Sequence, residues 1–84
     1  MNLATLLTRA ARSRPDHCAI KVGTSPYASY AELETRVARI AGWLRNSAGL
    51  EPGDRVGFAM SNCPEFIEVL WACWHAGLVA VPIN

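Results

Sequence analysis

The segment Gly77-Leu78-Val79-Ala80-Val81-Pro82-Ile83-Asn84 decides the fold of this chain. Its glycine is typical of the end of a helix, and the short apolar run after it is typical of a buried strand. A second strand is predicted over residues 55–60, and a helix between the two strands begins after the turn Ser61-Asn62-Cys63-Pro64. A strand, a helix and a strand with short connections form a right-handed parallel crossover, which makes the fold class α/β.

A helix and a β-hairpin are predicted to precede this crossover unit. The helix covers residues 3–13, with Asn2 as its cap. Strands over residues 18–22 and 27–29 are separated by turn residues 23–26. The apolar face of the helix consists of Leu3, Leu6, Leu7 and Ala10.

The helix after the hairpin has the clearest start signal in the chain. Ser29 and Glu32 have the spacing of a capping box, in which each side chain accepts a hydrogen bond from the other residue's backbone N–H. The helix is expected to run to Gly49, which provides a left-handed stop. Arg36, one turn after Glu32, is expected to pair with it on the outer side. The predicted buried face consists of Leu33, Val37, Ile40, Ala41 and Leu44.

The helix between the parallel strands is apolar around most of its circumference. Glu65, Glu68 and His75 mark a narrow polar strip, with Ala72 among them, and this strip is expected to face solvent. A helix of this kind belongs deep inside a protein, and 84 residues cannot surround it. Hydrophobic residues make up 51% of the chain and charged residues 18%, against roughly 25% charged in ordinary globular domains. We therefore expect an incomplete parallel βαβ unit within a larger multi-layer α/β domain, or a chain that pairs with its own copy.

Composition excludes several classes of function. The net charge is +1 and no basic stripe is present, which argues against nucleic-acid binding. The longest apolar run, residues 69–74, is far below the roughly 18 residues of a membrane span. Cys18, Cys63 and Cys73 fit no zinc or disulfide pattern, and three free thiols suit the reducing cytoplasm.

The turn over residues 61–64 is the candidate binding site by position. It lies at the carboxyl end of a parallel strand and at the start of a helix, where open α/β sheets place ligands and helix amides hold anions. The chain has no G-x-G-x-x-G segment, so an ordinary helix cap is the favoured interpretation.

The remaining candidate side chains also favour structural roles. Cys63 at a helix start is a conceivable nucleophile, but His17 and His75 are not next to it in sequence. His75 is interpreted as a solvated residue near a helix end. Trp43, Trp71 and Trp74 are interpreted as packing residues. The chain is predicted to contain no catalytic, cofactor-binding or metal-binding residue.

Five segments in order resemble the amino-terminal stretch of the adenylate-forming (AMP-binding) superfamily, which includes acyl-CoA synthetases, luciferases and peptide-synthetase adenylation domains. The ending Val81-Pro82-Ile83-Asn84 resembles the acyl-CoA synthetase, or fatty-acid–CoA ligase, branch, whereas peptide-synthetase domains more often have Asp where this chain has Asn84. The five segments are Arg14-Pro15-Asp16, Ser29-Tyr30-Ala31-Glu32-Leu33, Leu50-Glu51-Pro52-Gly53-Asp54-Arg55-Val56, Ser61-Asn62-Cys63-Pro64-Glu65-Phe66 and Ala76-Gly77-Leu78-Val79-Ala80-Val81-Pro82-Ile83-Asn84.

The resemblance implies that residues 1–84 are the amino-terminal portion of the large domain of an ATP-dependent carboxylate–CoA ligase acting on a fatty or aromatic acid. Such enzymes use ATP, Mg²⁺ and CoA to form an acyl-adenylate and then an acyl-CoA. The family's catalytic residues match no position here, so the segment alone is expected to be inactive. It is expected to pack against the remainder of its parent chain and, when isolated, to self-associate. A free-standing dimerising module, a peptide-synthetase-type adenylation fragment and a small nucleotide- or anion-binding domain are the alternatives.

Overall fold

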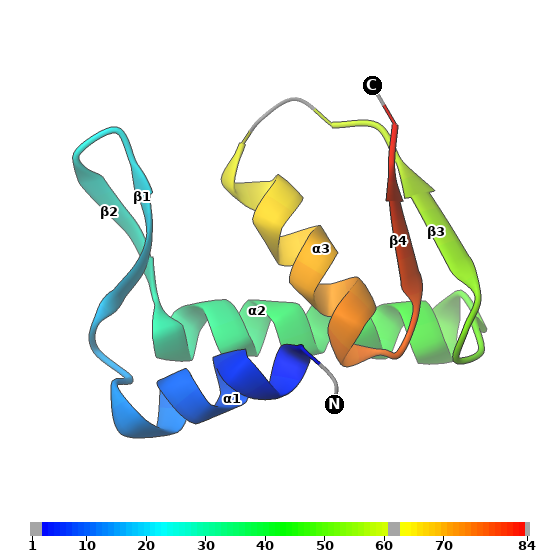
Figure 1. The fold of residues 1–84 in the computed structure, drawn as a ribbon, viewed down its shortest axis with the longest axis horizontal. Helices are drawn as coiled ribbons and strands as arrows, with labels where there is room; N and C mark the ends of the chain where they lie inside the picture. The colour runs from blue at the N-terminus through cyan, green and yellow to red at the C-terminus, as the bar shows by residue number, and fades with distance from the viewer. Residues whose placement is uncertain (1–2, 61–62, 84) are drawn as a thin grey trace.

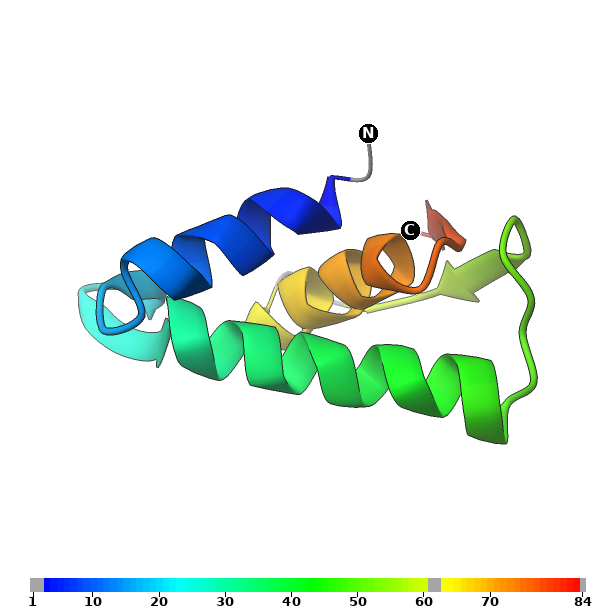
Figure 2. The ribbon, with the colours of Figure 1, turned by 90° about the horizontal axis from the view of Figure 1, so that it is seen from below.

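The computed structural model describes residues 3–60 and 63–83, which form a mixed α/β arrangement with two small sheets. Strands β1 and β2 pair antiparallel, and β3 and β4 pair parallel. The two sheets lie at opposite ends of α2 (Figure 1, Figure 2). This arrangement confirms the predicted fold class. The elements are α1 (Ala4–Ser13), β1 (Cys18–Val22), β2 (Ser25–Ser29), α2 (Tyr30–Gly42), the π-helix η1 (Trp43–Ser47), β3 (Arg55–Phe58), α3 (Pro64–His75) and β4 (Val79–Pro82).

Helix α1 buries only part of its predicted apolar face. Leu7 is buried, but Leu3 and Leu6 remain 49% and 46% exposed. Leu6 borders an open apolar groove between α1, β1, α2 and α3, and the described residues leave about half of its side chain uncovered. The predicted cap residue, Asn2, lies outside the described residues.

The hairpin has a tighter turn than predicted. Only Gly23 and Thr24 form the turn, because a two-residue loop that begins with glycine is sufficient to reverse the chain. Ser25 and Pro26, predicted as turn residues, instead belong to β2, where Pro26 pairs with Lys21. Proline is tolerated here because a two-stranded hairpin consists of edge strands.

The start of α2 confirms the capping box. The Ser29 backbone N–H donates to Glu32 Oε1 at 2.9 Å, and the Glu32 N–H donates to Ser29 Oγ at 3.2 Å. The far end differs from the prediction, because the last turn is the π-helix η1, in which the Ala48 N–H donates to the Trp43 carbonyl at 2.9 Å. Gly49 follows with φ = 73°, the predicted left-handed stop.

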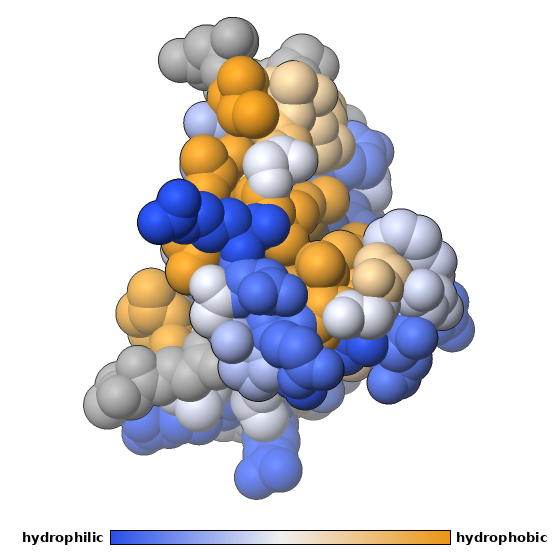
Figure 3. Space-filling model, turned by 90° about the vertical axis from the view of Figure 1, so that its right-hand side faces the viewer, coloured by the Kyte–Doolittle hydropathy of each residue, from blue (hydrophilic) through white to orange (hydrophobic). Residues whose placement is uncertain are grey.

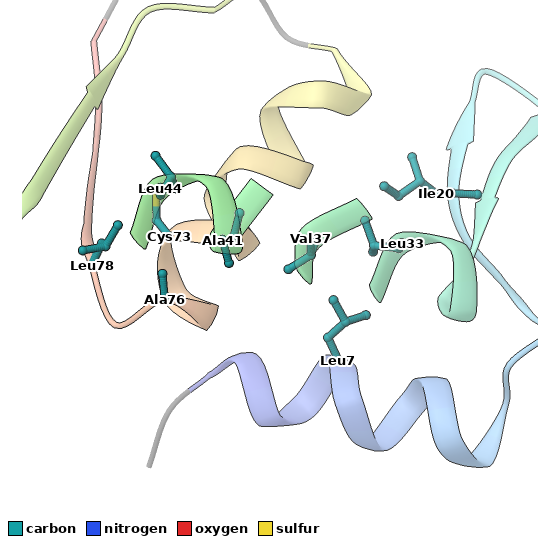
Figure 4. Close-up of a cluster of buried hydrophobic side chains, with 11 residues drawn as sticks. Leu7, Ile20, Leu33, Val37, Ala41, Leu44, Cys73, Ala76 and Leu78 are labelled. Atoms are coloured by element: carbon teal, nitrogen blue, oxygen red, sulfur yellow. The ribbon is translucent and has the colours of Figure 1, made fainter. Parts of the chain in front are cut away.

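The core forms along one face of α2. Figure 4 shows Leu33 and Val37 between Leu7 of α1 and Ile20 of β1, while Ala41 and Leu44 lie towards Cys73 of α3. The side chain of Val37 is completely buried. The predicted face of α2 is therefore confirmed, with Ile40 partly buried at its margin.

The inward face of α3 differs in part from the prediction. Glu68 is only 7% exposed and Ala72 is fully buried, so these two residues of the strip expected to face solvent face inward instead, beside the fully buried Cys73. The small side chains of Ala72 and Cys73 allow α3 to approach α2 closely, and close packing favours this face over one with indole rings. His75 and Glu65 are exposed, as expected. The large apolar side chains that are only half-buried or exposed are Phe66, Ile67, Leu70, Trp71 and Trp74.

Helix α3 ends in a Schellman motif. Gly77 has φ = 77°, and the Leu78 N–H donates to the Cys73 carbonyl at 2.8 Å. Strand β4 then pairs with β3 in a register that places Val79 beside Arg55. Val79 and Val81 are 47% and 38% exposed, and apolar atoms run along this side of the molecule (Figure 3).

Candidate functional site

The candidate site lies where β3 and β4 end and α3 begins. Both strands point towards the same end of the molecule, and the first turn of α3 lies at that end (Figure 1). Pro64 occupies the first turn, as predicted, and Cys63 is the cap residue without a side-chain cap hydrogen bond. The Phe58 and Phe66 ring centroids are 5.3 Å apart, joining the end of β3 to the start of α3. Ser61 and Asn62, the other two residues of the predicted turn site, lie outside the described residues.

The carboxylate of Glu65 already occupies the start of α3. Hydrogen bonds hold the pKa of Glu65 below its usual value, first from its own backbone N–H and then from the Cys63 side chain. A negative group at a helix amino terminus is favoured by the helix dipole. A second anion would meet repulsion from Glu65, so the geometry favours the helix-cap interpretation over an anion site.

The structure places neither histidine beside Cys63. Cys63 borders the hairpin tip beside Val22 and Gly23, whereas His17 lies at the hairpin base, where its carbonyl accepts from the Tyr30 N–H. His75 ends the 12-residue helix that Cys63 caps, at about 1.5 Å per residue, so the two lie about 18 Å apart along the axis.

The other two cysteines also lack the features of a nucleophile. Burial raises the pKa of the Cys73 thiol, so it acts as a small apolar packing residue. Cys18 lies exposed at the start of β1, where its Sγ donates to the Ile20 carbonyl at 3.2 Å. All three thiols are free.

An arginine side chain contacts the carboxyl end of α3. Arg45 Nη1 donates to the carbonyl of Ala76 at 3.2 Å, so a guanidinium contacts the helix end, and His75 is exposed. Trp71 and Trp74 pack edge to face, with ring centroids 5.0 Å apart. This contact supports the predicted packing role of these two rings, while Trp43 is 60% exposed on η1.

Among residues 3–60 and 63–83, the structure gives no support for a Mg²⁺ or phosphate site. Within residues 3–60 and 63–83, no group of three or more His, Cys, Asp or Glu is placed to hold a metal ion. The sequence lacks a glycine-rich phosphate loop, and Glu65 places a negative charge at the start of α3, near the ends of β3 and β4. In that same described part of the chain, no helix combines the length and apolar character needed to cross a membrane.

One polar cluster was missed by sequence reasoning. The Tyr27 hydroxyl donates to Glu68 Oε2 at 2.8 Å, and the Arg36 guanidinium carbon lies 4.9 Å from the Tyr27 ring centroid. Arg36 makes this ring contact, and its charge also helps to lower the pKa of Glu32, after the hydrogen bonds from Ser29, so the predicted attraction between Arg36 and Glu32 is retained. One feature of the sequence could have predicted that Glu68 faces inward. Ala72 lies one helical turn after Glu68, and a small residue allows a second helix to approach that face closely.

Comparison with known proteins identifies the family. A sequence model of the AMP-binding enzyme family matches residues 7–84. The chain is 47% identical over 76 residues to a feruloyl-CoA synthase from Amycolatopsis, a match that covers 90% of the chain and 15% of that protein. It is 41% identical over 63 residues to long chain acyl-CoA synthetase 1 of Arabidopsis thaliana, covering 75% of the chain and 9% of that protein.

The solved structures agree with the sequence matches. A mutant form of coronafacic acid ligase from Pectobacterium brasiliense superposes with a TM-score of 0.89 at 32% identity, covering the whole of this chain and 16% of that one. The matched segment is thus part of a much larger chain in these relatives, and the present chain spans a small share of their length. The chain belongs to the AMP-binding enzyme family, and its resemblance to adenylate-forming enzymes is confirmed.

Proposed function

We propose that residues 1–84 are the amino-terminal portion of the large AMP-binding domain of a carboxylate–CoA ligase. The observation that carries this proposal is the 47% identity to a feruloyl-CoA synthase over nine-tenths of the chain. The acid is proposed to be aromatic or fatty, because the relatives include both a feruloyl-CoA synthase and a long chain acyl-CoA synthetase. A cytoplasmic location is part of the proposal, and the three free thiols support it.

The role proposed for this segment is structural. It supplies α2, α3 and the parallel pair β3–β4 as framework, while the groups that bind ATP, Mg²⁺ and CoA are proposed to lie in other parts of the protein. The carboxylate of Glu65 at the start of α3 supports this division, because it disfavours a phosphate at that position. The segment alone is therefore expected to be inactive.

The proposed partner of the segment is the remainder of its own chain. Parallel sheets are normally covered on both faces, yet Val79, Val81 and Ile83 remain 47%, 38% and 53% exposed. In isolation the same surface is proposed to bind a second copy, because unpaired strand edges and exposed apolar side chains favour association.

Acid-dependent exchange of pyrophosphate into ATP tests the reaction class. The intact protein is assayed with ferulate, a long-chain fatty acid and an amino acid, and the 84-residue chain is assayed in parallel. We expect exchange with an aromatic or fatty acid in the intact protein and none in the 84-residue chain. Exchange in the isolated segment would overturn the proposed structural role, and the lack of exchange with every acid would overturn the proposed ligase.

A peptide-synthetase-type adenylation domain is the second candidate. It is favoured by a 39% identity over 76 residues to phenyloxazoline synthase MbtB of Mycobacterium. The two candidates differ in the acceptor of the acyl group. Formation of an acyl-CoA from free CoA supports the CoA ligase, whereas exchange without acyl-CoA formation supports the adenylation domain.

A further inference from the structure

Three side chains from three elements connect the hairpin to α3. Tyr27 of β2 donates to Glu68 of α3 through a hydrogen bond of 2.8 Å that spans 41 residues of sequence. Arg36 of α2 lies over the Tyr27 ring, 4.9 Å from its centroid, in the geometry of a cation–π contact. We call Tyr27, Arg36 and Glu68 the latch. It is the point at which polar side chains of β2, α2 and α3 meet.

The burial of the latch gives it more weight than a surface contact. Glu68 is 7% exposed, and glutamate is rarely buried to this extent without a partner. A hydrogen bond to a carboxylate is roughly twice as strong as a neutral one. The bond to Glu68 is also the main reason that the pKa of Tyr27 is raised, so the hydroxyl stays protonated and remains a donor.

Arg36 is held in place at a cost. Its Nη1 atom is buried and has no hydrogen-bond partner. A buried donor without a partner is unfavourable by about 1–3 kcal/mol, so the surrounding residues impose this position on the guanidinium. We therefore assign the Arg36 guanidinium a role in fixing the position of the Tyr27 ring, rather than in adding to the free energy of unfolding.

The rest of the hairpin is attached at its base and through Ile20 and Ala28, which belong to the core, while its outer part has few contacts. Its base is tied by backbone hydrogen bonds, from Tyr30 N–H to the His17 carbonyl at 3.0 Å and from Ala31 N–H to the Pro15 carbonyl at 3.1 Å. Ile20 and Ala28 are its only buried side chains among the described residues, and its tip is exposed. The hairpin is therefore fixed at its base and free at its tip, with the latch between them.

The free tip faces the start of α3 across an open groove of about 270 Å³. Hairpin residues 20–23 line one side, and Cys63, Pro64 and Ile67 line the other. We propose that the latch sets the width of this groove, holding the hairpin against α3 while the base acts as the pivot. When the latch is broken, the outer part of the hairpin, residues 21–27, moves away from α3, while Ile20 and Ala28 stay in the core along α2.

Amide hydrogen exchange in the intact protein tests the proposal. Tyr27→Phe removes one oxygen atom and leaves the ring for Arg36. We expect exchange of the amides in the outer part of the hairpin, residues 21–27, to become about tenfold faster, because the lost bond is charge-assisted. Exchange within α2 is expected to stay unchanged. Tyr30→Phe is the matched control, since Tyr30 lies at the start of α2 outside the latch, and it is expected to leave hairpin exchange unchanged.

Glu68→Gln provides a second, independent readout. It is expected to lower the pKa of Tyr27 towards its ordinary value, as followed in the intact protein by the NMR chemical shift of the Tyr27 ring carbon bonded to the hydroxyl. The double variant Tyr27→Phe/Glu68→Gln is expected to exchange no faster than Tyr27→Phe, because both changes remove one bond. Unchanged hairpin exchange in Tyr27→Phe would overturn the proposal. A uniform increase that includes α2, or an equal effect of Tyr30→Phe, would overturn it too.

Discussion

Helix α2 and the β3–α3–β4 unit differ in how completely the chain itself covers them. The inward face of α2 is sealed, with Val37 fully buried and a capping box at its start. The β3–α3–β4 unit is covered on one side only, where Ala72 and Cys73 of α3 pack towards α2, while Trp71 and Val79 still have exposed area. The contrast indicates that the apolar face of α2 is buried by contacts within this segment. The exposed apolar side chains of the parallel unit depend on contacts from outside it.

The largest expected effect tests the sealed side. Val37→Asp places a charge without a partner in the core, and such a charge costs about 3–5 kcal/mol. Because a chain of this size is marginally stable, the variant is expected to lose its helical circular dichroism. Urea unfolding followed by circular dichroism measures the change. Ala38→Asp, at the exposed neighbouring position, is the control, and equal unfolding midpoints for the two variants would contradict the assignment of the core.

The next effect tests the close approach of α3 to α2. Ala72 is fully buried, so Ala72→Leu inserts volume where there is no space, at a cost of about 1–3 kcal/mol. Ile67→Leu, on the exposed side of the same helix, is expected to change the free energy of unfolding little. If the two variants have equal stability, Ala72 does not mark the packing face.

The start and the buried face of α2 could be predicted from the sequence, because its capping residues and its apolar repeat agree with the packing in the structure. The Ser29–Glu32 spacing predicted the capping box, and the apolar repeat through Leu33 and Val37 predicted the buried face. The π-helix η1 was missed, since nothing in its residues distinguishes one more α-helical turn from a wider one.

The inward face of α3 could not be predicted by hydrophobicity. Its indole rings are apolar but too large for the space beside α2, so the small residues and Glu68 face inward. The rule that large apolar residues lie inside assumes that other parts of the chain pack against every apolar face. In this segment the face of α3 with the indole rings has no such complete packing. The candidate turn site was interpreted as a helix cap from the missing glycine loop, and the carboxylate of Glu65 at that position agrees.

A smaller effect concerns the capping box. Ser29→Ala removes the hydroxyl that accepts from Glu32 N–H, and we expect a loss of about 1 kcal/mol in the free energy of unfolding. Thr35→Ala, on the exposed side of α2, is the control. Equal losses in the two variants would indicate that the cap is not formed.

The capping box also predicts a pH dependence. The pKa of Glu32 lies below its usual value because its carboxylate accepts from the Ser29 backbone N–H and is further bonded to the Ser29 side chain. A lowered carboxyl pKa contributes stability that is present above the unfolded-state pKa of about 4.3 and is lost as the pH falls through the folded-state pKa. Glu32→Gln is therefore expected to reduce the slope of stability against pH in the acid range. An unchanged slope between pH 3 and 5 would contradict this.

The smallest effect on stability is expected on β4, at the exposed side of the β3–α3–β4 unit. Val79→Thr/Val81→Thr retains β-branched side chains on β4 and replaces two exposed methyl groups by hydroxyls. Because these positions are 47% and 38% exposed, we expect the free energy of unfolding to change by less than about 0.5 kcal/mol per substitution. Self-association of the isolated segment, measured by sedimentation velocity over a range of concentrations, is expected to weaken. Val22→Thr, on the hairpin tip and 53% exposed, is the matched control and is expected to leave association unchanged.

The two readouts of this variant separate an interface from a core. If Val79 and Val81 contribute to the fold of the segment, replacing a methyl group by a hydroxyl lowers the free energy of unfolding. If they form an interface, the same change weakens self-association alone. Undiminished association of Val79→Thr/Val81→Thr would place the contact elsewhere, on the apolar groove bordered by Leu6 and Trp71. A large loss of stability would show instead that β4 is already covered within the segment, and the contrast with α2 would then disappear.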